Sequence, residues 1–224
     1  MRILIAGAGR AGLSVAAHLL EAGHQVIVID REQGLARRAA EQHGLVTLVG
    51  DATETETLTG AEAGRADVAV AMLRRDADNL AFSLLARLAG ARTVMARMRD
   101  AAYRPVYVAA GVSRVLSEID MFIGAFGTAI EHNEIRQALV VGDGQSIAFE
   151  MTVPPKALVV GQTIAKISAH PDFPDDCVVA GLFVAGKPVS KVRGGSVIEA
   201  GMGVLLVTPR AGISAALRFF VRPA

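Results

Sequence analysis

A glycine-rich turn near the start of the chain constrains the fold more than any other feature. The segment Gly-Ala-Gly-Arg-Ala-Gly at residues 7–12 follows an apolar strand at residues 2–6 and opens a helix at residues 11–22. A second apolar strand at residues 25–29 leads directly into Asp30. Glycines at this spacing, between a strand and a helix and with an acidic residue after the next strand, are typical of a dinucleotide-binding βαβ unit. The pattern predicts a Rossmann-type fold.

The residues of this turn are suited to a phosphate group. The first glycine permits a tight turn, the second lets the backbone approach the phosphate, and the third allows the helix to pack on the sheet. Unpaired N–H groups at the helix N-terminus attract the anion. Asp30 can accept hydrogen bonds from both ribose hydroxyls and would repel a 2′-phosphate, a preference that Arg31 weakens. We therefore predict an adenine nucleotide of the NAD or ATP type, bound by Gly7, Ala8, Gly9, Arg10, Ala11, Gly12, Asp30 and Arg31.

Strand and helix patterns alternate through the rest of the first half. Further strands are predicted at residues 45–49, 68–72, 93–96 and 114–116, with helices at residues 76–89 and 103–110. This alternation favours an α/β fold with a doubly wound parallel sheet.

The pattern changes near residue 120. Residues 120–133 predict one long helix with an apolar surface, which is either buried within the fold or packed against a partner. Shorter β-rich segments follow: a hairpin of residues 138–141 and 146–153 around Asp143 and Gly144, a second hairpin at residues 177–185 with its turn at residues 186–188, a strand at residues 203–208 and a helix at residues 211–221. We expect a Rossmann-type domain over residues 1–134 and a smaller α+β subdomain over residues 135–224.

Composition excludes several classes of protein. The net charge is +1 without a long basic run, which argues against a nucleic-acid partner. The longest charge-free apolar stretches have about ten residues, whereas about 20 are needed to cross a bilayer, so we expect no direct membrane insertion. Cys177 is the single cysteine, and the first residues predict a strand rather than a signal peptide. We expect a soluble cytoplasmic protein.

A polar group follows the third predicted strand, where the adenine end of a nucleotide lies in this topology. Asp51, Ala52 and Thr53 are therefore candidate ligand contacts. Alternatively, Asp51 or Thr53 caps a helix that starts at Glu54.

Two later positions have similar alternatives. Asn79 lies near the start of the helix after the fourth strand and is a candidate contact or a structural residue. Arg97 and Arg99 follow the fifth strand, where they either meet phosphates or are ordinary surface arginines.

Catalytic groups are hard to find in the sequence. No lysine precedes Lys156, and the five histidines lack metal-ligand spacing. Tyr103 and Tyr107 lack the lysine four residues later that a short-chain reductase would use. We predict a sensed ligand rather than an enzyme, with a small NAD-dependent oxidoreductase as the alternative.

Taken in order, several segments resemble the RCK family, the cytosolic nucleotide-binding regulatory subunits of Trk/Ktr-type potassium uptake systems. The matching segments are residues 3–12, 28–30, 50–53, 69–71, 76–79, 96–99, 111–115 and 117–121, followed by residues 157–161, 178–182 and 198–207 in the second half. The resemblance covers nearly the whole chain and is more specific than the glycine turn alone.

The resemblance implies a regulatory function. Family members bind NAD, NADH, ATP or ADP, form dimers through the crossover helix (here residues 120–133), and assemble into octameric rings beneath a membrane potassium transporter. It implies that Asp30 contacts ribose, that Asp51 and Thr53 lie near adenine, and that Arg10 reaches phosphates. Glu118 matches a family position near a divalent or monovalent cation at the dimer interface, with a cap or a salt bridge as the alternative. Some relatives bind a cyclic dinucleotide in the C-terminal subdomain, for which this sequence gives no sign.

One segment departs from many relatives. Leu73, Arg74 and Arg75 stand where small polar or acidic residues are common, so two positive charges are added at the mouth of the nucleotide site. They either favour a triphosphate or form ion pairs with Asp76 and Asp78. A nucleotide sensor unconnected to ion transport is a further alternative.

Overall fold

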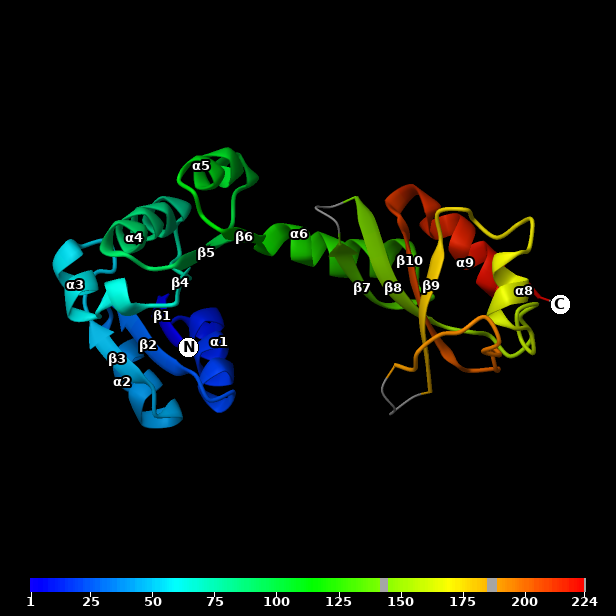
Figure 1. Cartoon of the computed structure of the whole chain (residues 1–224), viewed down its shortest axis with the longest axis horizontal. Helices are drawn as coiled ribbons and strands as arrows, with labels where there is room; N and C mark the ends of the chain where they lie inside the picture. The colour runs from blue at the N-terminus through cyan, green and yellow to red at the C-terminus, as the bar shows by residue number, and fades with distance from the viewer. Residues whose placement is uncertain (142–144, 185–188, 224) are drawn as a thin grey trace. The chain divides into compact units, whose positions relative to one another are not determined.

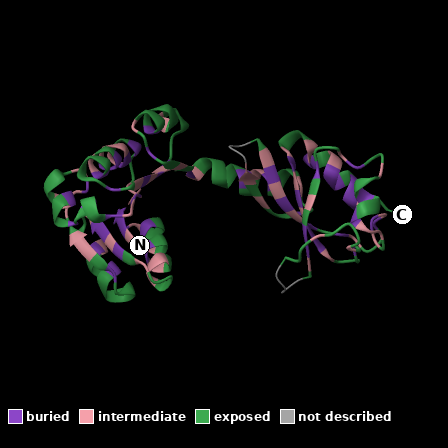
Figure 2. Ribbon diagram, viewed as in Figure 1, coloured by how far each residue is buried: buried purple, intermediate pink, exposed green. Residues whose placement is uncertain are grey.

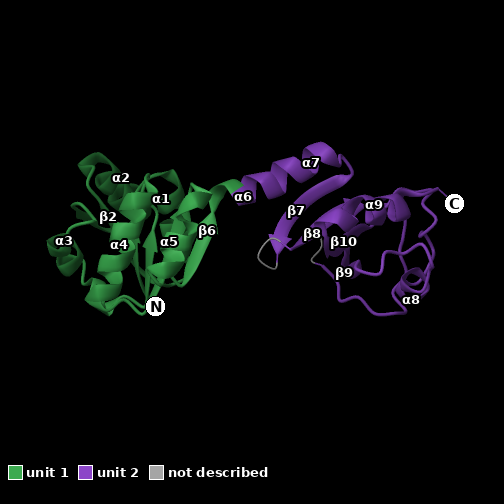
Figure 3. Cartoon of the chain, turned by 90° about the horizontal axis from the view of Figure 1, so that it is seen from above, with its two compact units in different colours: residues 1–119 green, residues 120–224 purple. Residues whose placement is uncertain are grey.

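The computed structural model describes residues 1–141, 145–184 and 189–223. The chain divides into two compact units, residues 1–119 and 120–224, coloured separately in Figure 3. Each has its own hydrophobic core.

The first unit is built on a parallel sheet of six strands. These are β1 (Arg2–Ala6), β2 (Gln25–Asp30), β3 (Val46–Val49), β4 (Val68–Ala71), β5 (Thr93–Met98) and β6 (Arg114–Ser117), in the order β3-β2-β1-β4-β5-β6. The strand order reverses between β1 and β4, which is where ligands bind in open sheets of this kind. The predicted Rossmann-type α/β fold is confirmed.

Helices cover both faces of this sheet (Figure 1). Helices α1 (Arg10–Glu21) and α2 (Gln33–His43) pack on the face that carries Ile3, Ile5 and Val28. Helices α3 (Thr55–Gly60), α4 (Asp76–Ala89) and α5 (Arg104–Ala109) pack on the opposite face. A 3₁₀ turn at Ala63–Arg65 follows α3, and another at Ala101–Tyr103 precedes α5. The sequence patterns did not predict α2, because the residues it buries are the small Ala36 and Ala39.

The helical segment after β6 is continuous but not uniform. It comprises α6 (Glu118–Phe122), a π-helical turn (Ile123–Gly127) and α7 (Thr128–Glu131), where we predicted one regular helix. It packs on strand β7 (Ile135–Val141), so closely that a Cβ added to Gly124 would lie 2.8 Å from Val140 Cγ2. Residues 120–131 of this segment therefore group with the second unit, whereas the sequence division between residues 134 and 135 placed them with the first.

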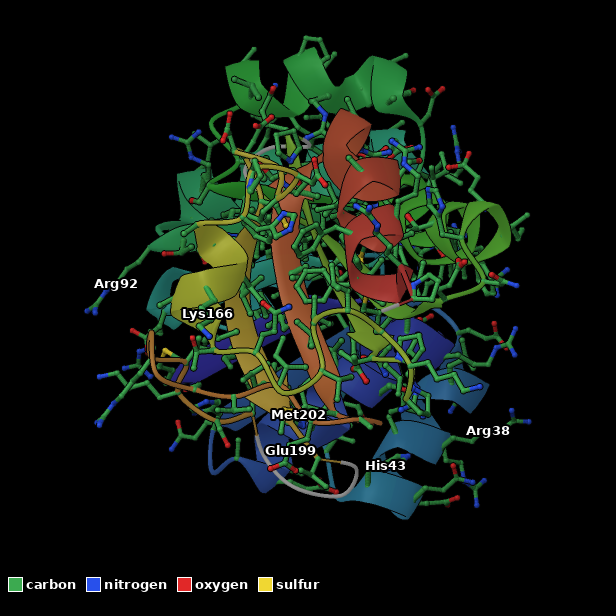
Figure 4. All side chains as sticks on the ribbon, turned by 90° about the vertical axis from the view of Figure 1, so that its right-hand side faces the viewer. Arg38, His43, Arg92, Lys166, Glu199 and Met202 are labelled. Atoms are coloured by element: carbon green, nitrogen blue, oxygen red, sulfur yellow. The ribbon has the colours of Figure 1, made fainter. Side chains whose placement is uncertain are left out.

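The second unit contains a four-stranded antiparallel sheet. Strands β7, β8 (Ser146–Thr152), β9 (Val178–Phe183) and β10 (Gly203–Pro209) are arranged in the order β7-β8-β10-β9. Helices α8 (Ile164–Ser168) and α9 (Ile213–Val221) complete it, and Figure 4 marks α8 at Lys166 and the approach to β10 at Met202. The buried positions, purple in Figure 2, include Phe219 and Phe220 of α9.

This arrangement matches the predicted smaller subdomain in its main parts. The hairpin of β7 and β8 is present, although its predicted turn at Asp143 and Gly144 lies outside the described residues. The turn predicted at residues 186–188 also lies outside them. Strand β9 pairs mainly with β10, and a single bridge joins Leu182 to Ser190 in the predicted second hairpin.

Candidate functional site

A cavity of about 890 Å³ lies in the first unit at the carboxyl ends of the strands, where the strand order reverses. Its lining comes from both halves of the sheet. We call the part formed by residues 7, 9–12, 29–32, 35 and 50–53 the glycine side, and the part formed by residues 72–75, 78, 97 and 118 the arginine side.

The glycine turn is closely packed at its first and third glycines and open at its second. Gly7 has a φ of 111°, and a Cβ there would lie 2.7 Å from Met72 O. A Cβ on Gly12 would lie 2.0 Å from Gly7 O. No atom lies within 4 Å of a Cβ built on Gly9, which borders the cavity. The turn therefore leaves space for a ligand only at Gly9, as predicted for a phosphate group.

Helix α1 begins at this turn, and no side chain of the helix itself caps or neutralises its N-terminus. Gly9 is its N-cap residue and offers no side chain for capping, and the first turn contains no acidic residue. The first N–H groups of a helix have no acceptor within it, and together with the helix dipole they attract anions. Arg10, the first residue of α1, is exposed and lines the cavity. This end of α1 can therefore hold a phosphate.

Asp30 is fixed at the end of β2 by two backbone groups. Its Oδ2 accepts a hydrogen bond from Ala8 N at 2.7 Å, and its Oδ1 accepts one from Glu32 N at 2.9 Å. Because a carboxylate oxygen can accept more than one hydrogen bond, both oxygens keep capacity for hydroxyl groups. Ala8 is buried and does not itself line the cavity, so its contribution is the amide that orients Asp30.

Asp51 and Thr53 form a local turn at the cavity wall rather than a helix cap. Asp51 Oδ1 accepts hydrogen bonds from Thr53 Oγ1 at 2.7 Å and from Thr53 N at 2.9 Å. Both hydrogen bonds lower the pKa of Asp51, the one from the Thr53 hydroxyl more than the one from the Thr53 amide. Helix α3 begins two residues later, and Glu54 at its N-cap makes no side-chain capping bond. The capping alternative is therefore wrong, and both side chains, with Ala52, line the cavity.

Asn79 makes structural hydrogen bonds, which was one of the two alternatives that the sequence left open. Its side chain is buried; Oδ1 accepts a hydrogen bond from Leu73 N at 2.7 Å, and Nδ2 donates to Leu73 O at 3.2 Å and to Arg97 O at 3.1 Å. All of these partners are backbone atoms, from the loop after β4 and from β5 itself. Asn79 does not line the cavity, so it positions the arginine side rather than contacting a ligand from it.

Arg97 and Arg99 converge on one carboxylate. Arg97 Nε lies 3.2 Å and Arg99 Nε 3.7 Å from Glu118 Oε2. The salt bridge that we gave as the alternative for Glu118 is therefore present. Within the described ranges, no group of three His, Cys, Asp or Glu side chains could hold a metal ion. A carboxylate held by two guanidinium groups does not fit the cation that the resemblance implied at Glu118.

The charges at the mouth of the cavity are only partly paired. Arg75 Nη1 lies 3.8 Å from Asp78 Oδ1. Asp76, the other expected partner, instead accepts hydrogen bonds from the amides of Arg99 and Asp100 and from the Tyr107 hydroxyl. In the described part of the chain, three exposed arginines of the lining have no carboxylate within 4 Å, namely Arg10, Arg31 and Arg74.

Several lining residues were not predicted as site residues. Glu32 and Leu35 come from the turn into α2 and from α2 itself, the helix that the patterns missed. Asp78 was considered only as an ion-pair partner of the arginines. An earlier recognition of α2 would have found the first two, because its N-terminus follows Asp30 at the same sheet edge.

Comparison with known proteins identifies the family. The model of the TrkA-N domain matches residues 3–118, which is more than half of the chain. The chain belongs to the TrkA-N family. TrkA of Mycobacterium tuberculosis is 30% identical over 176 residues, which are 77% of this chain and 79% of that protein. The TrkA homolog of Methanothermobacter thermautotrophicus is 28% identical over 168 residues, which are 75% of this chain and 77% of that protein.

Other relatives are longer. TrkA of Vibrio alginolyticus is 27% identical over 202 residues, and the chain spans 43% of its length. Among solved structures, the GsuK channel has a TM-score of 0.70 at 18% identity, covering 100% of this chain and 40% of that one. The GsuK channel bound to NAD has a TM-score of 0.69 over the same shares of the two chains. Because these two structures cover the whole chain, they support the fold of the second unit as well as that of the TrkA-N domain.

Proposed function

We propose that the chain is a regulatory subunit of a potassium transporter, which binds an adenine nucleotide in the cavity and responds to its identity. The observation that carries this proposal is the pairing of an open Gly9 with a fixed Asp30 at the same sheet edge. A phosphate at the start of α1 and a ribose at Asp30 would use both features.

The relatives support this assignment. The curated proteins named above are Trk system potassium uptake proteins, and a structural neighbour of the chain is a channel described as bound to NAD. Another solved structure in the comparison is described as GsuK bound to ADP. NAD, NADH, ATP and ADP are therefore the ligands to test.

The lining of the cavity favours binding over catalysis. Its described side chains are arginines, carboxylates, Thr53 and apolar residues, together with glycines. This set can hold phosphates and hydroxyls in place. We propose that the bound nucleotide leaves the site chemically unchanged, in contrast to the oxidoreductase alternative.

The helical segment Glu118–Glu131 exposes an apolar surface that we assign to a second copy of the chain. Its exposed side chains are between 49% and 82% accessible: Ile119, Met121, Phe122, Ile123, Phe126 and Ile130. Apolar surface concentrated on one segment is typical of a protein contact. We propose a homodimer through this segment, and a ring of eight chains on the cytoplasmic side of the transporter. In the described part of the chain no helix is both long and apolar enough to span a membrane.

Calorimetry and scattering test the proposal together. Asp30→Ala should weaken ADP binding at least tenfold, because the ribose hydroxyls lose their acceptor and the turn loses the carboxylate that holds the Ala8 amide. Solution scattering of the wild-type protein should differ between ATP and ADP or between NADH and NAD, since a ligand shifts a conformational equilibrium only by its differential affinity. Unchanged affinity would remove Asp30 from the site, and identical curves with all four ligands would contradict regulation by nucleotide state.

A further inference from the structure

We propose that a phosphate group in the cavity displaces Glu118 from Arg97, and that this exchange of ion pairs transmits nucleotide binding to the helical segment Glu118–Glu131. The proposal rests on the proposed function, because the three residues involved lie in or beside the same cavity. We call Arg97, Arg99 and Glu118 the Glu118 cluster.

The cluster is held by charge with incomplete hydrogen bonding. One oxygen, Glu118 Oε2, faces the Nε atoms of both arginines, at 3.2 Å for Arg97 and 3.7 Å for Arg99. Arg97 Nε is buried and has no hydrogen-bond partner within the described residues. A buried N–H group without an acceptor is costly. The resting arrangement therefore leaves Arg97 able to gain from a better acceptor.

A phosphate is such an acceptor. It presents several charged oxygens to the planar guanidinium group, and bonds between these groups are shorter and stronger than neutral hydrogen bonds. Arg97 and Glu118 both line the cavity. An incoming phosphate would be attracted to Arg97 and repelled by Glu118. The attraction to Arg97 and the repulsion from Glu118 would therefore both favour breaking the ion pair between these two residues.

The position of Glu118 gives the exchange a structural consequence. It is the first residue of α6 and directly follows β6, while Arg97 belongs to β5. Arg99 Nη1 also donates a hydrogen bond to Arg74 O at 3.1 Å, so Arg99 connects the cluster to the loop after β4. Release of Glu118 would remove the ion pairs that its own side chain makes with Arg97 of β5 and with Arg99. The amides of residues 118–122 should then exchange with solvent more readily.

The two guanidinium groups also supply the positive charge at this position. A cation would have to compete with Arg97 and Arg99 for a single carboxylate. The response of residues 118–122 to a phosphate-containing ligand should therefore need no divalent cation.

Hydrogen–deuterium exchange of the full chain with ADP in EDTA tests this inference. In the wild-type protein, ADP should raise the exchange rate of the amides at residues 118–122 at least threefold, whereas adenosine should not. In Glu118→Gln, the rate should be raised without ADP and ADP should add nothing. The same variant should bind ADP about threefold to tenfold more tightly by calorimetry, because Arg97 has lost its competing carboxylate.

Asp78→Asn is the matched control. It removes one negative charge from the same cavity, at the carboxylate that faces Arg75, but leaves the Glu118 cluster intact. Without ADP, the exchange rate of the amides at residues 118–122 should stay at its wild-type value in this variant, because the ion pairs of the Glu118 cluster are unchanged.

The outcomes separate the two proposals. Binding of ADP without a change at residues 118–122, the same basal rise in Asp78→Asn as in Glu118→Gln, or a response that requires Mg²⁺ would overturn the displacement of Glu118 while leaving nucleotide binding in place. Failure of the wild-type protein to bind any of the four nucleotides would overturn the proposed function, and the displacement of Glu118 with it.

Discussion

The glycine side and the arginine side of the cavity are held by different kinds of interaction, hydrogen bonds on the first and ion pairs on the second. On the glycine side, Asp30 and Asp51 accept hydrogen bonds at 2.7–2.9 Å from the backbone and from the Thr53 hydroxyl. On the arginine side, long side chains make ion pairs at 3.2–3.8 Å with one another and with the adjacent Arg99. Short groups fixed by the backbone suit recognition of a constant part of a ligand. Long, loosely paired charges suit a response to the part that varies.

The largest expected effect is a loss of stability caused by a substitution in the glycine turn. A Cβ on Gly12 would lie 2.0 Å from Gly7 O, so Gly12→Ala must displace backbone atoms and should lower the free energy of unfolding by about 3 kcal/mol. In contrast, Gly9→Ala meets no atom within 4 Å and should unfold like the wild-type protein while losing ADP binding. Urea unfolding and calorimetry of both variants measure these differences. Equal stability of the two variants would show that the turn is less rigid than described.

A smaller effect is expected from loosening the arginine side. Asn79→Ala removes three hydrogen bonds to the backbone of Leu73 and Arg97 and should lower the free energy of unfolding by about 2 kcal/mol. It should also weaken ADP binding, because Leu73 and Arg97 both line the cavity. Ser83→Ala, one turn along α4, removes a single bond to Asn79 O and should cost about 1 kcal/mol without affecting ADP binding. Similar affinities in the two variants would argue against a positioning role for Asn79.

The smallest expected effect is the contribution of Asp51, on the glycine side, to the pH dependence of stability. Hydrogen bonds from Thr53 hold the pKa of Asp51 below its ordinary value of 3.8 in the folded protein. This contribution to stability is present above about pH 4 and is lost as the pH falls through the lowered pKa. Solvent exposure of Asp51 limits it to less than about 1 kcal/mol. Asp51→Asn should therefore flatten the fall of the unfolding free energy below about pH 4, and parallel curves for both proteins would contradict this.

The glycine turn and Asp30 could be placed together at the sheet edge from the sequence, because they are close together in the chain. Glu32 and Leu35 on the same side were missed, and nucleotide binding by this side stays a prediction. The turn at residues 7–12 and Asp30 belong to one βαβ unit, and spacing alone relates them. The arginine side depends on contacts between distant segments. Asn79 meets Arg97 across 18 residues, and no local pattern shows that its amide is used by the backbone. The pairing of Glu118 with Arg97 and Arg99 could be given only as an alternative, since it depends on the ends of β5 and β6 lying side by side.

Secondary structure was missed where helices are short or bury only small residues. Helix α8 has five residues, and α2 buries two alanines among charged and polar neighbours. Apolar spacing gives little signal in either case. The long helix after β6 was expected from its apolar residues, but its internal geometry was not.

The π-helical turn Ile123–Gly127 determines the direction in which the side chains of α7 point. A π turn contains one residue more than an α turn, and each residue of an α-helix rotates the chain by about 100°. Side chains of α7 are therefore rotated by about that angle from where an unbroken α-helix starting at Glu118 would place them. Deleting one residue from this turn would rotate Ile130 relative to Met121 without removing either side chain. A helical wheel drawn with a single period would assign the apolar residues on the two sides of the turn to the wrong relative faces.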